Sequence, residues 1–139
     1  MRRLLIVSAA VEGAVGVALI LIPTLSIYTL LGKAPETPMA ICVTRGVGVS
    51  LIALGTVYWL ARNYVRSAAV RGLVVAILIY NGVFILILGY ARLGLGLDGI
   101  GLWPGILLHI VLAVWCVICL GLRTDSEGPA KTQSNNTKN

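Results

Sequence analysis

The chain has 139 residues, of which 58% are hydrophobic and 12% charged, and its formal net charge is +6. Soluble domains carry about 25% charged residues and fewer than about half apolar ones, so this composition excludes a soluble globule and a disordered chain. The expected partner is therefore a membrane and not a nucleic acid. One helical span needs about 20 apolar residues, so the length accommodates four spans with short connections.

Four long apolar runs cover residues 4–22, 40–61, 70–90 and 102–122. Each run is long enough to cross a bilayer as a helix, and none shows the alternation of polar and apolar residues that is typical of barrel strands. The sequence predicts an all-α fold, a four-helix transmembrane bundle over residues 1–123. The polar tail at 124–139 is expected to be disordered and cytoplasmic.

The connections also carry signals. Pro23 predicts the end of the first span, and the apolar stretch 25–31, which stops at Gly32, predicts a short helix in the membrane interface. Residues 33–38 contain two prolines and predict an exposed turn. The glycine-rich segment 91–101 predicts a loop that lies against the membrane surface.

Basic residues near the span ends are distributed unevenly. One side is expected to hold Arg2, Arg3, Arg62, Arg66, Arg71 and Arg123, whereas the other holds Lys33 and Arg92. Cytoplasmic loops of membrane proteins carry the excess of Lys and Arg. The sequence therefore predicts that both termini are cytoplasmic.

Each span carries a strongly polar residue away from its ends: Glu12, Arg45, Asn81 (beside Tyr80) and His109. A charge at mid-helix costs about 2.5 to 3.5 kcal/mol on insertion scales, so these groups are expected to converge inside the bundle. We expect an ion pair between Glu12 and Arg45, with hydrogen bonds from Asn81, Tyr80 or His109. Two roles remain open for this cluster, which either fixes helix packing or forms a ligand-binding or proton-handling site.

The sequence predicts no metal site and no catalytic set. His109 is the only histidine, and no cysteine or carboxylate stands at metal-ligand spacing from it, so haem is not expected either. Neither a Ser-His-Asp set nor a phosphate loop is present. The sequence thus favours a protein that is not an enzyme.

Cys116 and Cys119 form a C-x-x-C motif on the fourth span. Such a motif resembles that of quinone-linked disulfide reductases of the vitamin K epoxide reductase type, and the resemblance implies thiol/quinone redox chemistry as one alternative function. The pair is expected near the cytoplasmic end, with the remaining cysteine, Cys42, near the outer face. Buried thiols in a reducing compartment mostly behave as small hydrophobic residues.

Glu12 lies in the first of four short spans, as does the glutamate of the small multidrug resistance transporters, which exchanges protons for cationic drugs. This similarity implies a second alternative function, a small proton-coupled transporter that uses Glu12. The asymmetry of the arginines argues against the dual orientation that many of those transporters adopt.

A broader resemblance covers residues 4–122. Its motifs are Val11-Glu12-Gly13, Leu30-Leu31-Gly32, Arg45-Gly46-Val47-Gly48, Tyr80-Asn81, Leu102-Trp103-Pro104 and Leu108-His109. Together they resemble small bacterial four-span proteins of unknown function that are loosely DoxX-like. The resemblance implies a protein of the bacterial inner membrane, and the association of some relatives with quinone-linked oxidoreductases implies an accessory role.

The first functional hypothesis combines these observations. It describes a non-enzymatic accessory or assembly subunit of a larger membrane complex or homo-oligomer, or a binder of a lipid-like small molecule such as a quinone. Its polar site would comprise Glu12, Arg45, Tyr80, Asn81 and His109.

Overall fold

The computed structural model describes residues 1–124, and all regular secondary structure in that part of the chain is helical. Four of its helices are long and apolar enough to cross a membrane, which confirms the predicted all-α, four-span architecture. Beyond Thr124, the predicted cytoplasmic tail lies outside the described residues. The five helices are α1 (Arg2–Leu21), α2 (Pro23–Leu31), α3 (Pro38–Ala61), α4 (Ala68–Leu93) and α5 (Leu102–Thr124).

Prolines set two of the helix boundaries. The chain leaves helical geometry at Ile22, where φ is −131° and ψ is 56°, and Pro23 then begins α2. Pro38 begins α3 in the same way. A proline in the first turn costs no hydrogen bond, because amides there have no partner within the helix. The short helix between the first two spans is confirmed, and it ends at Gly32 in the left-handed conformation (φ 77°), which glycine adopts easily.

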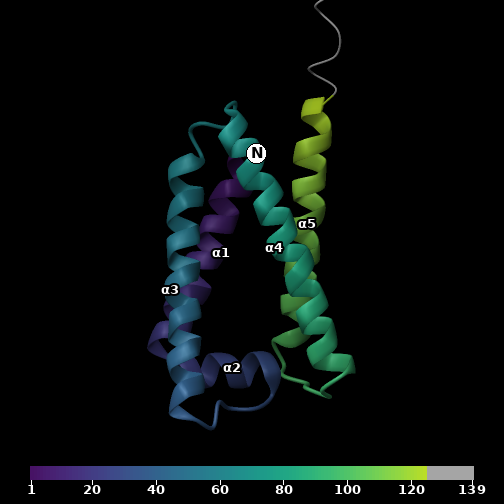
Figure 1. The fold of residues 1–139 in the computed structure, drawn as a ribbon. Coiled ribbons are helices and arrows are strands. Elements are labelled where there is room, and N and C mark those ends of the chain that lie inside the picture. Colours follow the sequence, from purple (N-terminus) through teal and green to yellow (C-terminus); the bar gives the residue numbers. More distant parts are fainter. Residues whose placement is uncertain (125–139) are drawn as a thin grey trace, which may run out of the picture.

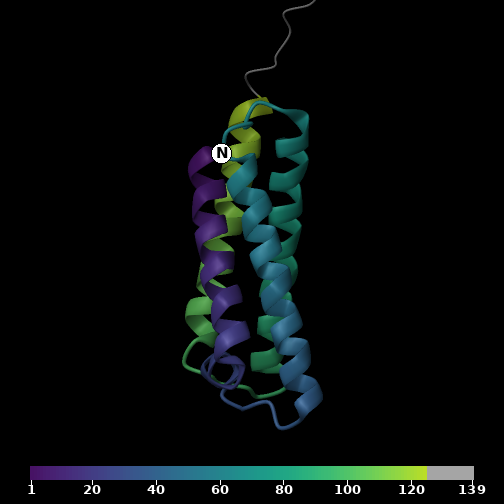
Figure 2. The same ribbon diagram turned by 90° about the vertical axis from the view of Figure 1, so that its left-hand side faces the viewer.

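The long helices form two pairs, α1 with α3 and α4 with α5 (Figure 1). The pairs meet at the end of the bundle that holds the N-terminus, which we call the N-terminal end. They diverge toward the opposite end, where α2 lies across the space between them; we call this the α2 end. Seen after a 90° turn, the four long helices run side by side along one axis (Figure 2).

A hydrophobic cluster joins the two pairs at the N-terminal end. It contains buried side chains from α1, α3, α4 and α5, namely Leu4, Leu5, Ala9, Tyr58, Val70, Val74, Ile77, Leu112 and Cys116. Because this is the region where all four long helices share buried side chains, it is the main packing contact between the pairs.

Within the first pair, glycines allow the backbones of α1 and α3 to approach closely. A Cβ atom placed on Gly16 would lie 2.7 Å from the carbonyl oxygen of Gly48, and a Cβ on Gly48 would lie 2.7 Å from the oxygen of Gly16. Real Cβ contacts are never this short, so only glycine fits at both positions. Such small-residue contacts hold helices together in membranes, where no hydrophobic force drives their association.

The connection between α4 and α5 holds α2 in place. The backbone N–H of Gly101 donates a 2.8 Å hydrogen bond to the carbonyl oxygen of Thr29. Gly99 is buried against the same helix end, and a Cβ there would overlap the carbonyl group of Leu30. The connection that was predicted to lie against the membrane surface therefore packs on α2.

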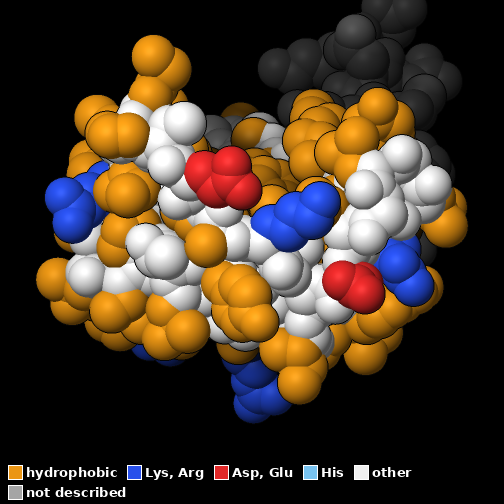
Figure 3. Space-filling view, turned by 90° about the horizontal axis from the view of Figure 1, so that it is seen from below, with side chains coloured by type: hydrophobic (Ala, Val, Ile, Leu, Met, Phe, Trp, Pro, Cys, Tyr) orange, Lys and Arg blue, Asp and Glu red, His pale blue; other side chains and the backbone are white. Residues whose placement is uncertain are grey.

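Charged residues differ between the two ends. The helix bounds place Arg2, Arg3, Arg62, Arg66 and Arg71 at the N-terminal end. At the α2 end, side chains of both signs are scattered among apolar and uncharged polar ones (Figure 3). Lys33 and Arg92 lie near this end together with Glu36 and Asp98. The uneven distribution expected from the sequence is thus present along the bundle axis.

Candidate functional site: a cavity between the helix pairs

A cavity of about 520 Å³ lies between the two helix pairs, and residues from all five helices line it. Most of the lining is apolar, including Leu19, Leu30, Leu88 and Leu112. Small-molecule sites in proteins are typically apolar cavities of about 300 to 1,000 Å³ with a few polar groups that orient the ligand. In this cavity the ionisable groups are Glu12, Tyr80 and His109.

Glu12 supplies the acidic group of the cavity. Its side chain is 5% exposed. The hydroxyl of Tyr80, on α4, donates a hydrogen bond to the Glu12 carboxylate and so links the two helix pairs. On the opposite side, Gly55 of α3 packs closely on α1 beside Glu12, since a Cβ at Gly55 would lie 3.0 Å from the Ala9 carbonyl oxygen and 3.6 Å from the Glu12 Cβ. Glu12 is the one acidic residue in the described part of the membrane-crossing helices.

His109 and Asn81 form a second polar pair next to the first. The Nδ1 atom of His109 lies 2.8 Å from Oδ1 of Asn81, whose side chain is 1% exposed. The Asn81 amide nitrogen donates a 2.8 Å hydrogen bond to the carbonyl oxygen of Ile77 within α4. Both the nitrogen and the oxygen of the asparagine side chain therefore have a hydrogen-bond partner, as burial in an apolar interior requires.

Aromatic contacts connect the two polar pairs. The His109 ring stacks on Phe84 with centroids 5.0 Å apart, and it meets the edge of Tyr80 at 6.0 Å. Tyr80 and Phe84 are themselves 4.8 Å apart. A continuous series of contacts thus runs from Glu12 through Tyr80 to His109. The structure brings four of the five predicted polar residues together.

The prediction of a Glu12–Arg45 ion pair is wrong. Arg45 lies exposed on the surface of α3, and within residues 1–124 no salt bridge joins it to Glu12. The face of α3 that is buried against α1 carries Thr44, Gly48, Leu51 and Gly55. Arg45 follows Thr44 directly, so it points about 100° away from that face. It lies about 10 Å along α3 from Pro38, a distance over which a long Arg side chain can bring its charge toward the membrane surface.

Phe84 and helix α2 are parts of the site that the polar-residue analysis missed. Phe84 stands four residues after Tyr80 and three after Asn81, a spacing that puts all three on neighbouring positions of one helix face. That spacing was available in the sequence. The contribution of α2 to the cavity wall was not, because it depends on how far the helix pairs diverge.

The cysteines lie away from the cavity. Cys116 is fully buried in the hydrophobic cluster of the N-terminal end, and Cys119 is partly buried beside it. Both are free thiols, as is the exposed Cys42 on α3. Neither member of the C-x-x-C pair lines the cavity, so redox chemistry at these residues stays a prediction. Among the described residues, no three His, Cys, Asp or Glu side chains gather as a metal site would require.

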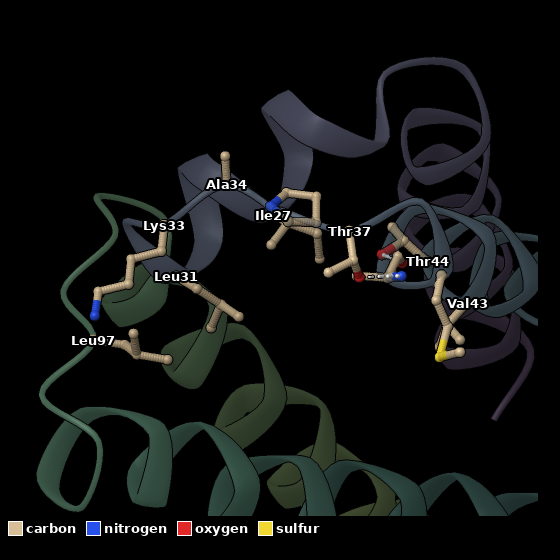
Figure 4. A pocket seen from close by; sticks show the side chains of 11 residues that line it. Ile27, Leu31, Lys33, Ala34, Thr37, Val43, Thr44 and Leu97 are labelled. Atoms are coloured by element: carbon tan, nitrogen blue, oxygen red, sulfur yellow. Dashed lines mark hydrogen bonds between the residues drawn. The ribbon is translucent and has the colours of Figure 1, made fainter.

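A second space of about 520 Å³ lies at the α2 end, between α2, the start of α3 and Leu97 (Figure 4). Both of its hydroxyl groups make hydrogen bonds to the backbone of α3. Thr37 accepts a 3.1 Å hydrogen bond from the backbone N–H of Ala40, and Thr44 donates one of 2.8 Å to the Ala40 carbonyl. Lys33 is the one charged residue of its lining. This groove therefore offers a ligand one ionisable group, whereas the cavity between the pairs offers three and is the stronger candidate site.

The four apolar helices and the cavity define the class as a multi-pass helical membrane protein with an internal cavity. No protein-family model matches the chain, and no curated protein and no solved structure is significantly similar to it. The resemblance to DoxX-like proteins stays a prediction.

Proposed function

We propose that the protein binds a lipophilic small molecule, such as a quinone or another lipid-like compound, in the cavity between the helix pairs. The observation that carries this proposal is the combination of a large apolar cavity with a small polar cluster in its wall. The apolar lining would take the body of the ligand, and Glu12, Tyr80 and His109 would orient its polar end.

Filling the cavity tests this proposal. Val15 and Val17 are both on α1 and are 43% and 46% exposed, but only Val15 lines the cavity. We expect Val15→Trp to abolish retention of the small molecule that co-purifies with the protein in mild detergent, detected by mass spectrometry of the extract. The matched variant Val17→Trp should retain it. Equal retention in both variants, or no retained compound in the unaltered protein, would contradict the proposal.

A proton-coupled transporter is the second candidate function. It is favoured by the placement of Glu12, a buried carboxylate that lines a cavity instead of being paired with a basic residue. Intramembrane acids of this kind occur along proton and substrate paths. A transporter must open this site to water, so a water-soluble carbodiimide should modify Glu12, and a transported substrate should protect it. A Glu12 that stays unmodified in liposomes would count against this function.

We further propose that the protein resides in the bacterial inner membrane with both termini in the cytoplasm, as a DoxX-like protein that serves a larger complex or a homo-oligomer. The support for the orientation is the excess of arginines at the N-terminal end. In a cysteine-free background, an impermeant maleimide applied to intact cells should label Glu36→Cys and spare Asn63→Cys. The opposite pattern would reverse the orientation.

The accessory role has its own test. Extraction in mild detergent should yield the protein together with a larger membrane complex or as an oligomer of itself. A single monodisperse monomer would argue against that role and would leave ligand binding as the function to pursue.

A further inference from the structure

Asn81 fixes the hydrogen-bonding roles of the two nitrogens of His109. Because the Asn81 amide nitrogen donates to the carbonyl oxygen of Ile77, the atom that faces His109 is the Asn81 oxygen, which is an acceptor. The Nδ1 atom of His109, 2.8 Å away, must therefore carry the hydrogen. In the neutral ring the other nitrogen, Nε2, then holds a lone pair and accepts hydrogen bonds.

Nε2 is the ring nitrogen that a ligand can reach. His109 lines the cavity, whereas Asn81, which occupies Nδ1, does not. Within the part of the chain that the structure describes, the side-chain hydrogen bond of His109 goes to Asn81. The imidazole therefore presents an acceptor to the cavity.

The other polar groups of this wall leave acceptors unused as well. The Tyr80 hydroxyl donates to Glu12, so its hydrogen is no longer available to a ligand. In its ionised form the Glu12 carboxylate offers about four acceptor positions, more than one tyrosine can fill. No Lys or Arg lines the cavity, and Arg45 lies outside the bundle. At the α2 end of the cavity, the Ser26 hydroxyl donates to the backbone carbonyl oxygen of Ile22 at 3.0 Å, and the Thr29 hydroxyl, which also lines the cavity, lies on α2 away from the Glu12–Tyr80–His109 wall.

From these roles we infer that the cavity selects an amphiphile whose polar end donates hydrogen bonds, such as a long-chain amine or a quinol, over one that only accepts them. This inference rests on the proposed ligand-binding function. An oxidised quinone or a fatty-acid carboxylate would place its own oxygens against Nε2 and against the acceptor positions of the ionised Glu12 carboxylate that Tyr80 does not fill, and these acceptors would stay without a donor. A donor end group can satisfy Glu12 and Nε2 together.

Two matched pairs of probes test the inference on the full-length protein in lipid nanodiscs. Decylubiquinol is compared with decylubiquinone, and dodecylamine with dodecanoate, with affinity measured from the change in tryptophan fluorescence. We expect the donor to bind at least tenfold more tightly in one or both pairs. Preference within the amine pair alone would identify an ammonium group as the recognised donor, and preference within the quinol pair alone would identify a hydroxyl group.

Two other outcomes would contradict the inference, and they differ in what they imply for the proposed binding function. Equal or tighter binding of the acceptor member in both pairs overturns the inference and leaves the proposed binding function standing. If no probe binds, the inference and the proposed function both fail.

Variants test whether Nε2 of His109 and the Glu12 carboxylate cause the preference for donor probes. His109→Phe keeps an aromatic ring against Phe84 but removes Nε2, and Glu12→Gln replaces one carboxylate oxygen by a donor group; each should reduce the tenfold preference to about threefold or less. Arg45→Gln lies outside the cavity and should leave the preference unchanged. If His109→Phe and Glu12→Gln both retain the full preference, the acceptors named here do not recognise the ligand. The probe comparison on the unaltered protein stays decisive if a variant fails to fold.

Discussion

The side-chain oxygen of Asn81 on α4 lies 2.8 Å from Nδ1 of His109 on α5, and this hydrogen bond joins the two helices of one pair directly behind the cavity wall. With the stacking of His109 on Phe84, it holds the imidazole in a single orientation. A polar contact thus joins α4 to α5, whereas a close backbone contact between Gly16 and Gly48 joins α1 to α3.

Replacing Asn81 by leucine should destabilise the protein by about 1 to 3 kcal/mol, because the Nδ1–H of His109 would then be buried without an acceptor. The free energy of unfolding can be measured by titration with sodium dodecyl sulfate, with tryptophan fluorescence as the signal. The double variant Asn81→Leu/His109→Phe removes both partners and should cost less than the sum of the single changes. Additive costs would show that the bond contributes little.

The glycine contact of the other pair predicts a contrast between two neighbouring positions on α3. Gly48→Ala would force a methyl group to within 2.7 Å of the Gly16 carbonyl oxygen. We expect a loss of about 1 to 3 kcal/mol, the usual cost of overpacking. Gly46 has open space around it, so Gly46→Ala should be neutral or stabilising by up to about 1 kcal/mol. Thermal unfolding in detergent compares the two, and equal melting temperatures would refute the close approach of α1 and α3.

Glu12 and Arg45 should behave as independent residues. Arg45→Gln is expected to change the free energy of unfolding by no more than about 0.5 kcal/mol, as at other exposed positions. The coupling energy from a double-mutant cycle with Glu12→Gln should be zero within about 0.5 kcal/mol. A buried ion pair would lose about 3 to 5 kcal/mol when one partner is removed. A coupling energy of that size would show that Glu12 and Arg45 form an ion pair and would contradict the structure.

Gly99 predicts a local effect on α2. A methyl group at this position would overlap the Leu30 carbonyl, so Gly99→Ala should push the α4–α5 connection away from α2. Hydrogen–deuterium exchange should then rise in peptides that cover Pro23–Leu31, since the bond from Gly101 to Thr29 would be lost. Gly89→Ala is the control, because the space around Gly89 is open. Unchanged exchange in α2 would mean that the connection does not hold it.

The helices themselves could be predicted from the sequence, because their limits follow from local chemistry. Twenty or more apolar residues in a row require a helix in lipid. Pro23 and Pro38 can begin a helix but cannot continue one, so they mark boundaries wherever they occur. The convergence of Glu12, Tyr80, Asn81 and His109 was also accessible, since polar groups in spans avoid lipid.

The position of Arg45 around its helix could not be predicted in the same way. Rise per residue gives the depth of a side chain in the membrane, whereas the direction in which it points depends on which face of α3 packs against α1. The contact between Gly16 and Gly48 decides that face. Glycines are common along these spans, so nothing in the sequence singles out the two whose backbones touch.

The divergence of the helix pairs has a consequence for the range of ligands. The α1–α3 and α4–α5 pairs share buried side chains at the N-terminal end and are bridged by α2 at the other (Figure 1). The width of the cavity therefore depends on the angle between the two pairs as well as on the side chains that line it. A ligand with a bulkier head group would need a wider angle, which the shared cluster at the N-terminal end and the α2 bridge oppose.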